Sequence, residues 1–309
     1  MDEVTRPRLK CVCANSSRIC YLPFMIFFKK RLKPDWTFPN GTNKSGKKVW
    51  RLSIGSDVLV AEFRDIDKKT VELAGIDLHS GSALWINDQL PVPSEKEKWW
   101  TTLNTIHKDV ILLQQYARPD MPTTAKIFVL DLFTGKLLWQ NHEVSFMSAV
   151  GDTIYCLKKS FPSEKTIGLN FRTGTENEIS TPELPGDHYV SPSDLILPDP
   201  IENVADDLWE YITRHHHAGL RIPPDVKHAM ILKLGQKSVI GFHLPSGKDP
   251  KGAALYNAHL IVADSEGRIV FEDVADRNVY VPLADFYFGV GGRLIYVKNS
   301  DEIVAIKLE

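Results

Sequence analysis

The chain has 309 residues, of which 43% are hydrophobic and 25% are charged, and its formal net charge is -2. This composition excludes an intrinsically disordered protein and supplies enough apolar material for a core. The 37 basic and 39 acidic residues nearly balance, so no global field attracts nucleic acid or an anionic membrane, and we predict neither as a partner.

Residues 1–32 are interpreted as an extension before the globular domain, either disordered or wrongly assigned to the reading frame. Their apolar run, ICYLPFMIFF (19–28), contains Pro23 and is shorter than the roughly 20 residues that cross a bilayer. As a signal peptide the run lacks a small-residue cleavage site, because Lys29 and Lys30 follow it. Translation from Met25 is the favoured explanation, and translation from Met1 stays open.

Three of the four cysteines lie in the first twenty residues. No disulfide framework can therefore span the body of the protein, and a reducing, cytoplasmic location is expected. The C-x-C-x6-C spacing has no nearby histidine and no second pair of ligands, so we predict no metal site there.

Two stretches share one pattern, Asp-Leu, two residues, Gly, three residues, Trp: GIDLHSGSALWI (75–86) and VLDLFTGKLLWQ (129–140). Weaker copies are LNFRTGTENEI (169–179) and IVADSEGRIVFED (261–273). Each copy predicts a β-hairpin, since glycine supplies the positive φ of a tight turn and the aromatic residue packs on the sheet. Two strand-like runs precede each hairpin. The unit is a four-stranded blade of about 40 to 50 residues, so the predicted fold is an all-β β-propeller.

The two ends of the chain supply complementary parts of one blade. LIYVKNSDEIVAIKLE (294–309) resembles the second and third strands of a unit, and KPDWTF (33–38) adds a strand with Trp36 in the aromatic position. Pairing of these ends closes a ring and removes exposed sheet edges. Counting aromatic positions predicts six blades in a single domain, residues 33–309. Five blades are predicted if residues 181–228 fold otherwise.

Residues 181–228 form the least regular part of the chain. The first half is too rich in proline for a central strand, and PIENVADDLWEYITRHHHAG (200–219) has helical spacing with Gly219 as a stop. We interpret the segment as a decorated blade or as an insertion over one face. The three histidines, 215–217, point about 100° apart on a helix, so they indicate a solvated helix end rather than a metal site.

On these residues the chain resembles two groups of proteins. The Asp-x-x-Thr-Gly-x-x-x-Trp hairpin of 131–139 is similar to the repeat of quinoprotein dehydrogenase propellers, which implies shared blades alone. Those enzymes are longer and hold calcium beside the quinone with acidic and amide side chains that have no match here. From about residue 33 to the C-terminus the chain also resembles an uncharacterised bacterial family, domain of unknown function 4905. This resemblance implies no activity and no cofactor. The stretches that carry this resemblance are VWRL (49–52), AEFRD (61–65), WWTTL (99–103) and LIYVKNSDEIVAIKL (294–308).

Four residues are candidate ligand contacts: Arg64, Trp99, Trp100 and Asp285. As neighbours in a strand, Trp99 and Trp100 would face opposite sides, one packed between blades and the other toward the channel or a loop, where a sugar or base could stack. Glu62 and Arg64 share one strand face, which predicts a structural ion pair. They lack a nucleophile or a second carboxylate, so no catalytic residue is predicted.

We therefore predict a non-catalytic propeller that binds an unknown protein or small-molecule ligand with one face of the ring and the 181–228 segment. The alternative is an enzyme with a channel-mouth site for a sugar or a quinone-related molecule, which calcium- or quinone-dependent stabilisation would favour. GVGGR (289–293) is followed by a strand rather than a helix, so a phosphate-binding loop is excluded.

Overall fold

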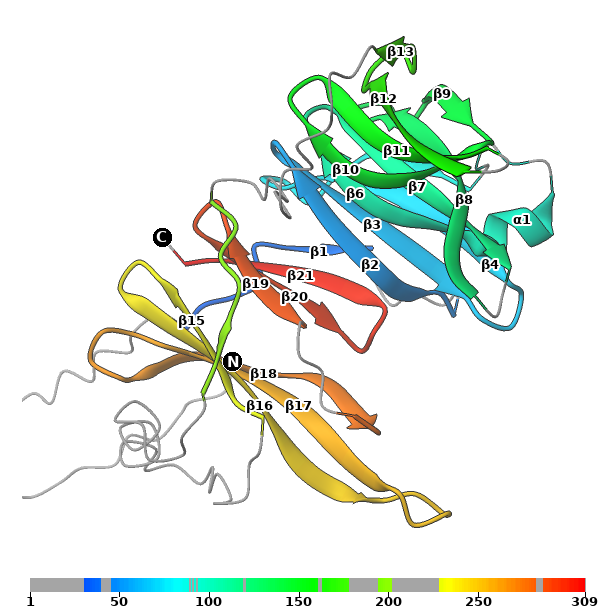
Figure 1. The fold of residues 1–309 in the computed structure, drawn as a ribbon. Coiled ribbons are helices and arrows are strands. Elements are labelled where there is room, and N and C mark those ends of the chain that lie inside the picture. Colours follow the sequence, from blue (N-terminus) through cyan, green and yellow to red (C-terminus); the bar gives the residue numbers. More distant parts are fainter. Residues whose placement is uncertain are drawn as a thin grey trace, which may run out of the picture. The chain divides into compact units, whose positions relative to one another are not determined.

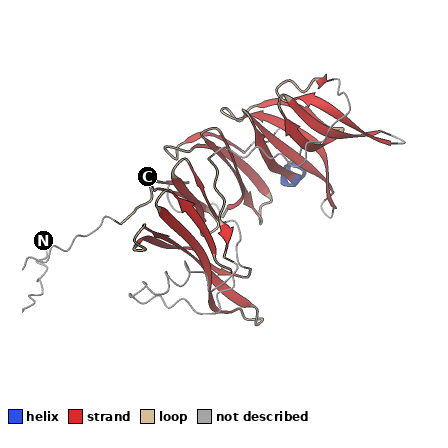
Figure 2. Ribbon diagram, turned by 60° about the vertical axis from the view of Figure 1, so that its left-hand side comes forward, coloured by secondary structure: helices blue, strands red, loops and turns tan. Residues whose placement is uncertain are grey.

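The structure, a computed structural model, is built mainly from β-strands (Figures 1 and 2). It describes residues 31–39, 46–88, 90, 92, 94–118, 121–160, 163–177, 194–201, 228–281 and 286–308. The chain divides into two units, Met1–Arg31 and Leu32–Glu309, and the second unit contains all the described strands and the described helix. The predicted all-β class is confirmed.

The described strands form five antiparallel sheets, numbered along the chain. Sheet 1 contains β2 (Lys48–Gly55), β3 (Val58–Asp65), β4 (Thr70–Asp77) and β5 (Ala83–Asn87). The helix α1 (Glu95–Trp100) leads into sheet 2, which contains β6 (Thr101–His107), β7 (Val110–Arg118), β8 (Met121–Asp131) and β9 (Leu137–Asn141). Sheet 3 contains β10 (Val144–Val150), β11 (Thr153–Ser160), β12 (Ser163–Asn170) and β13 (Glu176–Asn177).

Sheet 4 has five strands and sheet 5 joins the two ends of the chain. Sheet 4 contains β14 (Asp199–Pro200), β15 (Met230–Leu234), β16 (Lys237–Lys248), β17 (Ala254–Ala263) and β18 (Ile269–Val279). Sheet 5 has the order β1-β21-β20-β19, with β19 (Tyr287–Val290), β20 (Arg293–Lys298), β21 (Glu302–Lys307) and β1 (Trp36–Phe38).

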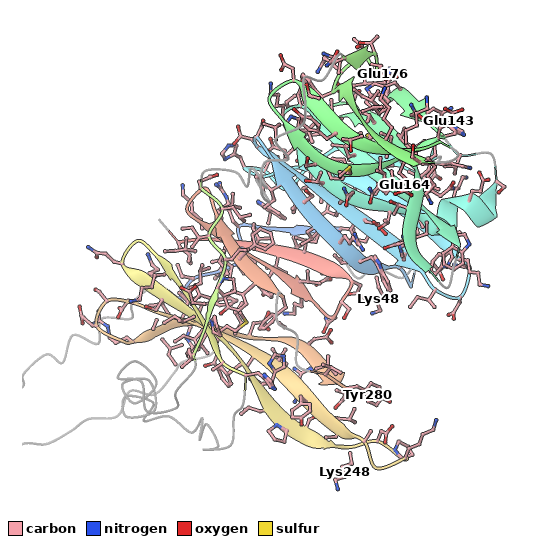
Figure 3. All side chains as sticks on the ribbon, viewed as in Figure 1. Lys48, Glu143, Glu164, Glu176, Lys248 and Tyr280 are labelled. Carbon is pink, nitrogen blue, oxygen red and sulfur yellow. The ribbon has the colours of Figure 1, made fainter. Side chains whose placement is uncertain are left out.

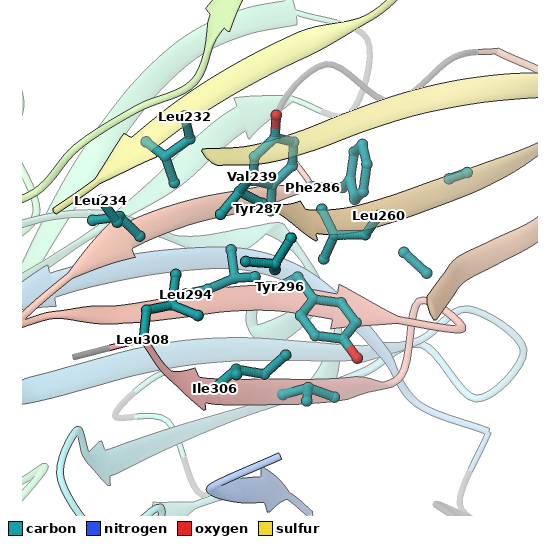
Figure 4. Close-up of a cluster of buried hydrophobic side chains, with 14 residues drawn as sticks. Leu232, Leu234, Val239, Leu260, Phe286, Tyr287, Leu294, Tyr296, Ile306 and Leu308 are labelled. Carbon is teal, nitrogen blue, oxygen red and sulfur yellow. The ribbon is translucent and has the colours of Figure 1, made fainter. Parts of the chain in front are cut away.

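Apolar clusters join sheets that follow one another. The cluster of Figure 4 packs sheet 4 against sheet 5 and includes Leu260, Tyr287 and Tyr296. Other clusters join sheet 5 to sheet 1, sheet 1 to sheet 2, and sheet 2 to sheet 3. Complete burial of a leucine- or phenylalanine-sized side chain contributes about 1.5–3 kcal/mol. The stacked faces are therefore the main source of stability in the second unit.

The four predicted hairpins are confirmed as antiparallel pairs: β4–β5, β8–β9, β12–β13 and β17–β18. Each turn contains a glycine with positive φ, as at Gly135, where φ is 66°. Oδ1 of Asp131 accepts hydrogen bonds from the backbone nitrogen of Thr134, at 3.0 Å, and from its hydroxyl, at 2.9 Å. The repeated aspartate therefore caps the turn that the repeated glycine allows.

The repeated tryptophans join one sheet to the next. Nε1 of Trp85 in sheet 1 donates to the carbonyl oxygen of Leu132 in sheet 2, at 2.9 Å. Nε1 of Trp139 in sheet 2 donates to the carbonyl oxygen of Phe171, beyond the end of β12 in sheet 3, at 3.0 Å. Each accepting carbonyl directly follows the aspartate or asparagine of the next copy. One copy of the motif therefore supplies both a turn and the indole that binds the following turn.

The first described strand pairs with the last one. β1 lies antiparallel to β21, with Trp36 opposite Ala305 and Phe38 opposite Ile303 (Figure 1). The predicted pairing of the two chain ends is confirmed. Closure of a complete ring and a count of six blades stay predictions, because five sheets are described and most of residues 181–228 lies outside the described part.

Within 181–228 the structure describes residues 194–201 and His228. β14 pairs with β15 at the edge of sheet 4, and Ile196 bridges to Gly289 of sheet 5. An edge position suits Pro200, which has no N–H to donate to a ladder. The helix expected over 200–219 does not begin at Pro200, which belongs to β14, and residues 202–219 with the three histidines lie outside the described residues.

Candidate functional site

Two of the four predicted contact residues meet where sheets 1 and 2 join. Arg64 lies near the end of β3 and Trp99 near the end of α1, and Cζ of Arg64 is 5.0 Å from the centroid of the Trp99 ring. Trp100 follows in α1 and is partly buried. Asp285 lies outside the described residues. The junction of sheets 1 and 2 is thus the described part of the predicted site.

The guanidinium of Arg64 is almost fully enclosed, with 6% of the residue exposed. Its Nε donates to Oε1 of Glu62 at 2.5 Å, Nη1 donates to the carbonyl oxygen of Trp99 at 2.8 Å, and Nη2 donates to that of Thr101 at 2.9 Å. All three nitrogens therefore have protein acceptors. Three of its five N–H groups thus bind the protein, and because Glu62 lies in sheet 1 while Trp99 and Thr101 lie at the start of sheet 2, Arg64 holds the two sheets together.

Glu62 completes this connection from the other side. The residue is fully buried, and its Oε2 accepts hydrogen bonds from the hydroxyl of Thr102 at 3.0 Å and from the backbone nitrogen of Leu103 at 2.6 Å. The structural ion pair predicted for Glu62 and Arg64 is confirmed. A buried carboxylate is tolerated when its oxygens are paired, as both oxygens are here.

Trp50 also contacts the guanidinium, and the sequence analysis did not select this residue. Its ring centroid lies 5.3 Å from Cζ of Arg64, so two indoles contact one cation. Trp50 is 51% exposed and lies at a β-bulge, between the pairs Val49–Phe63 and Arg51–Glu62. A bulge re-aims a side chain that regular alternation would place elsewhere. The sequence signal was a large aromatic residue among the cations of KVWR, at the start of a strand.

The predicted strand at Trp99 and Trp100 is wrong, because both residues belong to the helix α1. Oγ of Ser94 accepts a hydrogen bond from the backbone nitrogen of Glu97, which caps the first turn. The strand begins at Thr101, whose hydroxyl donates to the carbonyl oxygen of Glu97 at 2.9 Å. Ser followed three residues later by Glu is a signature of a helix start that the sequence already contained. Trp99 packs on the cluster shared by sheets 1 and 2, which agrees with the expected packing role.

Arg51 stands beside Trp50 and is exposed. Its Nη1 donates to the carbonyl oxygen of Leu103 at 3.1 Å, and its Nη2 lies 3.5 Å from the hydroxyl of Tyr116. Lys48, at the start of the same strand, projects from the ribbon in Figure 3. We call Lys48, Trp50 and Arg51 the Trp50 face. It offers one open indole surface and cationic side chains.

Asp65 lies next to Arg64 but turns away into a loop. Its Oδ1 accepts hydrogen bonds from the backbone nitrogens of Asp67, at 3.1 Å, and Lys68, at 3.0 Å. These bonds, the backbone bond from Lys68 above all, lower the pKa of the Asp65 carboxyl below its ordinary value. The carboxylate therefore caps the β3–β4 turn and is not an acid or base of the site.

The described residues contain no group of three or more His, Cys, Asp and Glu side chains that could hold a metal ion. At the Trp50 face the available groups are an indole, a guanidinium and an ammonium. These groups stack on flat molecules and bind anions, and none of them is a nucleophile or a general base at neutral pH. The chemistry of these three side chains therefore suits the binding of a flat or anionic group.

A family model, described as a domain of unknown function (DUF4905), matches residues 52–139. The matched range runs from within β2 to within β9, so it covers most of sheets 1 and 2 and is narrower than the resemblance expected from residue 33 onward. No curated protein matches the sequence. No helix among the described residues has the length and apolar character needed to cross a membrane.

Several solved structures are similar to the chain at low identity. BamB from Moraxella catarrhalis is 11% identical, with 83% of this chain and 84% of that chain covered and a TM-score of 0.23. The β-propeller domain of the Trilobed protease from Pyrococcus furiosus is 10% identical, with 82% and 64% covered and a TM-score of 0.27. Acylaminoacyl peptidase from Pyrococcus horikoshii is 11% identical, with 83% and 36% covered and a TM-score of 0.27. The chain thus spans about a third of the peptidase.

Proposed function

We propose that residues 33–309 form one β-propeller domain of six or five blades, and that this domain is a non-catalytic platform that binds a partner at the Trp50 face. The propeller is supported by the antiparallel sheets of four or five strands, by the apolar clusters that join sheets 4 and 5, 5 and 1, 1 and 2, and 2 and 3, and by the pairing of β1 with β21. A rigid scaffold with exposed strand ends and loops is a common basis for binding sites.

One observation carries the binding function: the half-exposed indole of Trp50 packs on the buried guanidinium of Arg64. Trp50 is 51% exposed, and the cation that it covers has protein acceptors on all three nitrogens. The ring is therefore fixed before any partner arrives, which lowers the entropy lost on binding. Aromatic residues and arginine are also the side chains most enriched where binding energy concentrates at interfaces.

The partner that we propose is a protein or a small molecule in the cytoplasm. The net charge of -2 gives no general attraction for nucleic acid or for an anionic membrane. The enzyme alternative has less support, because Arg64, one of its weakly favoured contacts, is committed to Glu62, Trp99 and Thr101.

Site-specific photocrosslinking tests the platform. The photoreactive amino acid p-benzoylphenylalanine would replace Trp50 in one variant and Phe133 in another, and each variant would be irradiated in the cells that produce the protein. Phe133 is a matched control, since it is 52% exposed but lies in the β8–β9 turn, outside the Trp50 face. We expect discrete adducts from position 50 and none from position 133.

Two results would contradict the proposal. One is adduct formation at position 133 with none at position 50, which would place the binding surface elsewhere. The other is turnover of a sugar or quinone-related substrate by the purified protein, which would favour the enzyme alternative.

A further inference from the structure

We infer that the Trp50 face binds an acidic peptide segment, with a carboxylate on Arg51 and a flat or apolar side chain on the indole of Trp50. This inference rests on the proposed function and adds the chemical class of the partner. It follows from the charge balance of the face, from the geometry of arginine and from the exposure of the indole.

Among the described residues, one cation of the face has no carboxylate partner. Nζ of Lys48 lies 3.6 Å from Oδ2 of Asp301 and donates to the carbonyl oxygen of Asn299. Arg51 has no carboxylate within ion-pair distance among the described residues, and its two protein contacts are with neutral oxygens. An exposed guanidinium with neutral partners keeps its full charge for a ligand.

The donors of Arg51 suit a carboxylate. Arginine has five N–H groups in a planar fork, and two nitrogens of Arg51 contact the protein, the second at the long distance of 3.5 Å. The remaining N–H groups can bind both oxygens of one carboxylate. A phosphate carries about two charges at neutral pH, and the single uncompensated cation of this face matches one negative charge better than two.

The indole favours an extended peptide as the source of that carboxylate. Small-molecule sites usually enclose about 70–90% of their ligand, whereas Trp50 is 51% exposed on the first strand of sheet 1. The guanidinium of Arg64 already contacts this ring, with Cζ 5.3 Å from the centroid, so we expect the exposed part of the indole to receive an amide plane or an aromatic ring rather than a second cation. A peptide with alternating acidic and aromatic residues meets both requirements.

Fluorescence anisotropy with two labelled peptides tests the inference. The probes are fluorescein-labelled Gly-Ser-Glu-Tyr-Glu-Ser-Gly and the same peptide with glutamine in place of glutamate. We expect the glutamate peptide to bind the full chain at least about tenfold more tightly, the difference of one charge-assisted pair. Raising NaCl from about 0.1 to about 1 M shortens the Debye length from about 10 to about 3 Å and should weaken the glutamate peptide alone.

Variants locate the binding on the Trp50 face. Arg51→Gln keeps an amide that can donate to the carbonyl oxygen of Leu103 and should lose about tenfold in affinity, while Arg51→Lys should lose less because it keeps the charge. Trp50→Ala should lose up to about tenfold. Phe133→Ala, a matched exposed aromatic residue, should bind like the wild type. Circular dichroism of each variant confirms that its fold is intact.

Several outcomes would overturn the inference. The first is equal binding of the two peptides, and the second is unchanged affinity of the Arg51→Gln variant for the glutamate peptide. The third is binding of oligogalacturonate, a sugar chain that carries carboxylates, by a protein that does not bind the glutamate peptide. Photocrosslinks at position 50 combined with no peptide binding would reject the acidic partner and leave the platform intact. Absence of both would reject the platform as well.

Discussion

The indole ring of Trp85 lies so close to Gly135 of the next sheet that a β-carbon built on this glycine would be 2.6 Å from the ring. Real β-carbons do not approach other atoms so closely, so the glycine is needed for contact as well as for its positive φ. The same distance separates Trp139 from a β-carbon on Gly174. The repeated glycine and the repeated tryptophan are therefore two halves of one contact between successive sheets.

Gly135→Ala is expected to destabilise the protein by about 2–5 kcal/mol. The backbone at Gly135 has φ of 66°, which costs about 1–2 kcal/mol for a residue with a β-carbon, and overpacking against the Trp85 ring adds about 1–3 kcal/mol. Gly151→Ala is the control, because Gly151 has φ of 57° but no atom within 4 Å of the place that an added methyl group would take. Urea unfolding of both variants measures the difference, and equal losses would show that the ring contact contributes nothing.

Trp36→Ala should cost about 3–5 kcal/mol, the usual loss for a buried tryptophan. Trp36 is 8% exposed, and its Nε1 donates to the carbonyl oxygen of Leu78 at 3.0 Å. Its strand pairs with β21 through three residues, so loss of the side chain weakens the joint between the chain ends. Trp50→Ala, at a half-exposed position, should cost less than about 1 kcal/mol. A similar unfolding midpoint for the two variants would contradict this account.

The repeat was predictable because its determinants are local. Asp131 and Gly135 lie four residues apart, and turn chemistry alone requires a capping side chain and a positive φ at these positions. The acceptor of each indole could not be predicted in this way. The carbonyl that Trp85 contacts belongs to Leu132, and that contact depends on how one sheet packs on the next.

For the candidate site, too, the contacts within one strand were predictable from the sequence and the contacts between sheets were not. Glu62 and Arg64 are two residues apart on one strand, so their pairing follows from strand alternation. The bonds from Arg64 to the carbonyl oxygens of Trp99 and Thr101 depend on where sheet 2 docks, which no local pattern encodes. Trp50 was missed because its exposure comes from a bulge, and a bulge breaks the alternation on which the prediction relied.

Glu62→Ala should destabilise the protein by about 3–5 kcal/mol, because it leaves the guanidinium of Arg64 buried without its counter-ion. The matched control is Glu143→Ala, which removes the exposed ion pair of Glu143 with Lys158 at 3.3 Å. Exposed pairs contribute little, so this variant should unfold close to the wild type. Chemical denaturation of both variants gives the comparison, and a small effect of Glu62→Ala would show that the junction tolerates an unpaired cation.

Acidification below about pH 6.5 should destabilise the protein through two histidines of sheet 4. Burial lowers the pKa of His243, which is 4% exposed, and also the pKa of His259, which stacks on Phe242 at 5.3 Å. The unfolded chain therefore takes up protons first as the pH falls, so stability is constant above about 6.5 and declines below it. Carboxylates with a lowered pKa, such as Asp65, change the stability only as the pH falls toward and below their ordinary pKa of 3.8. They therefore do not contribute to the decline just below pH 6.5.

Urea midpoints measured between about pH 8 and about pH 5 should fall for the wild type and fall less for the double variant His243→Asn, His259→Gln. An unchanged slope in the double variant would assign the pH dependence to other groups.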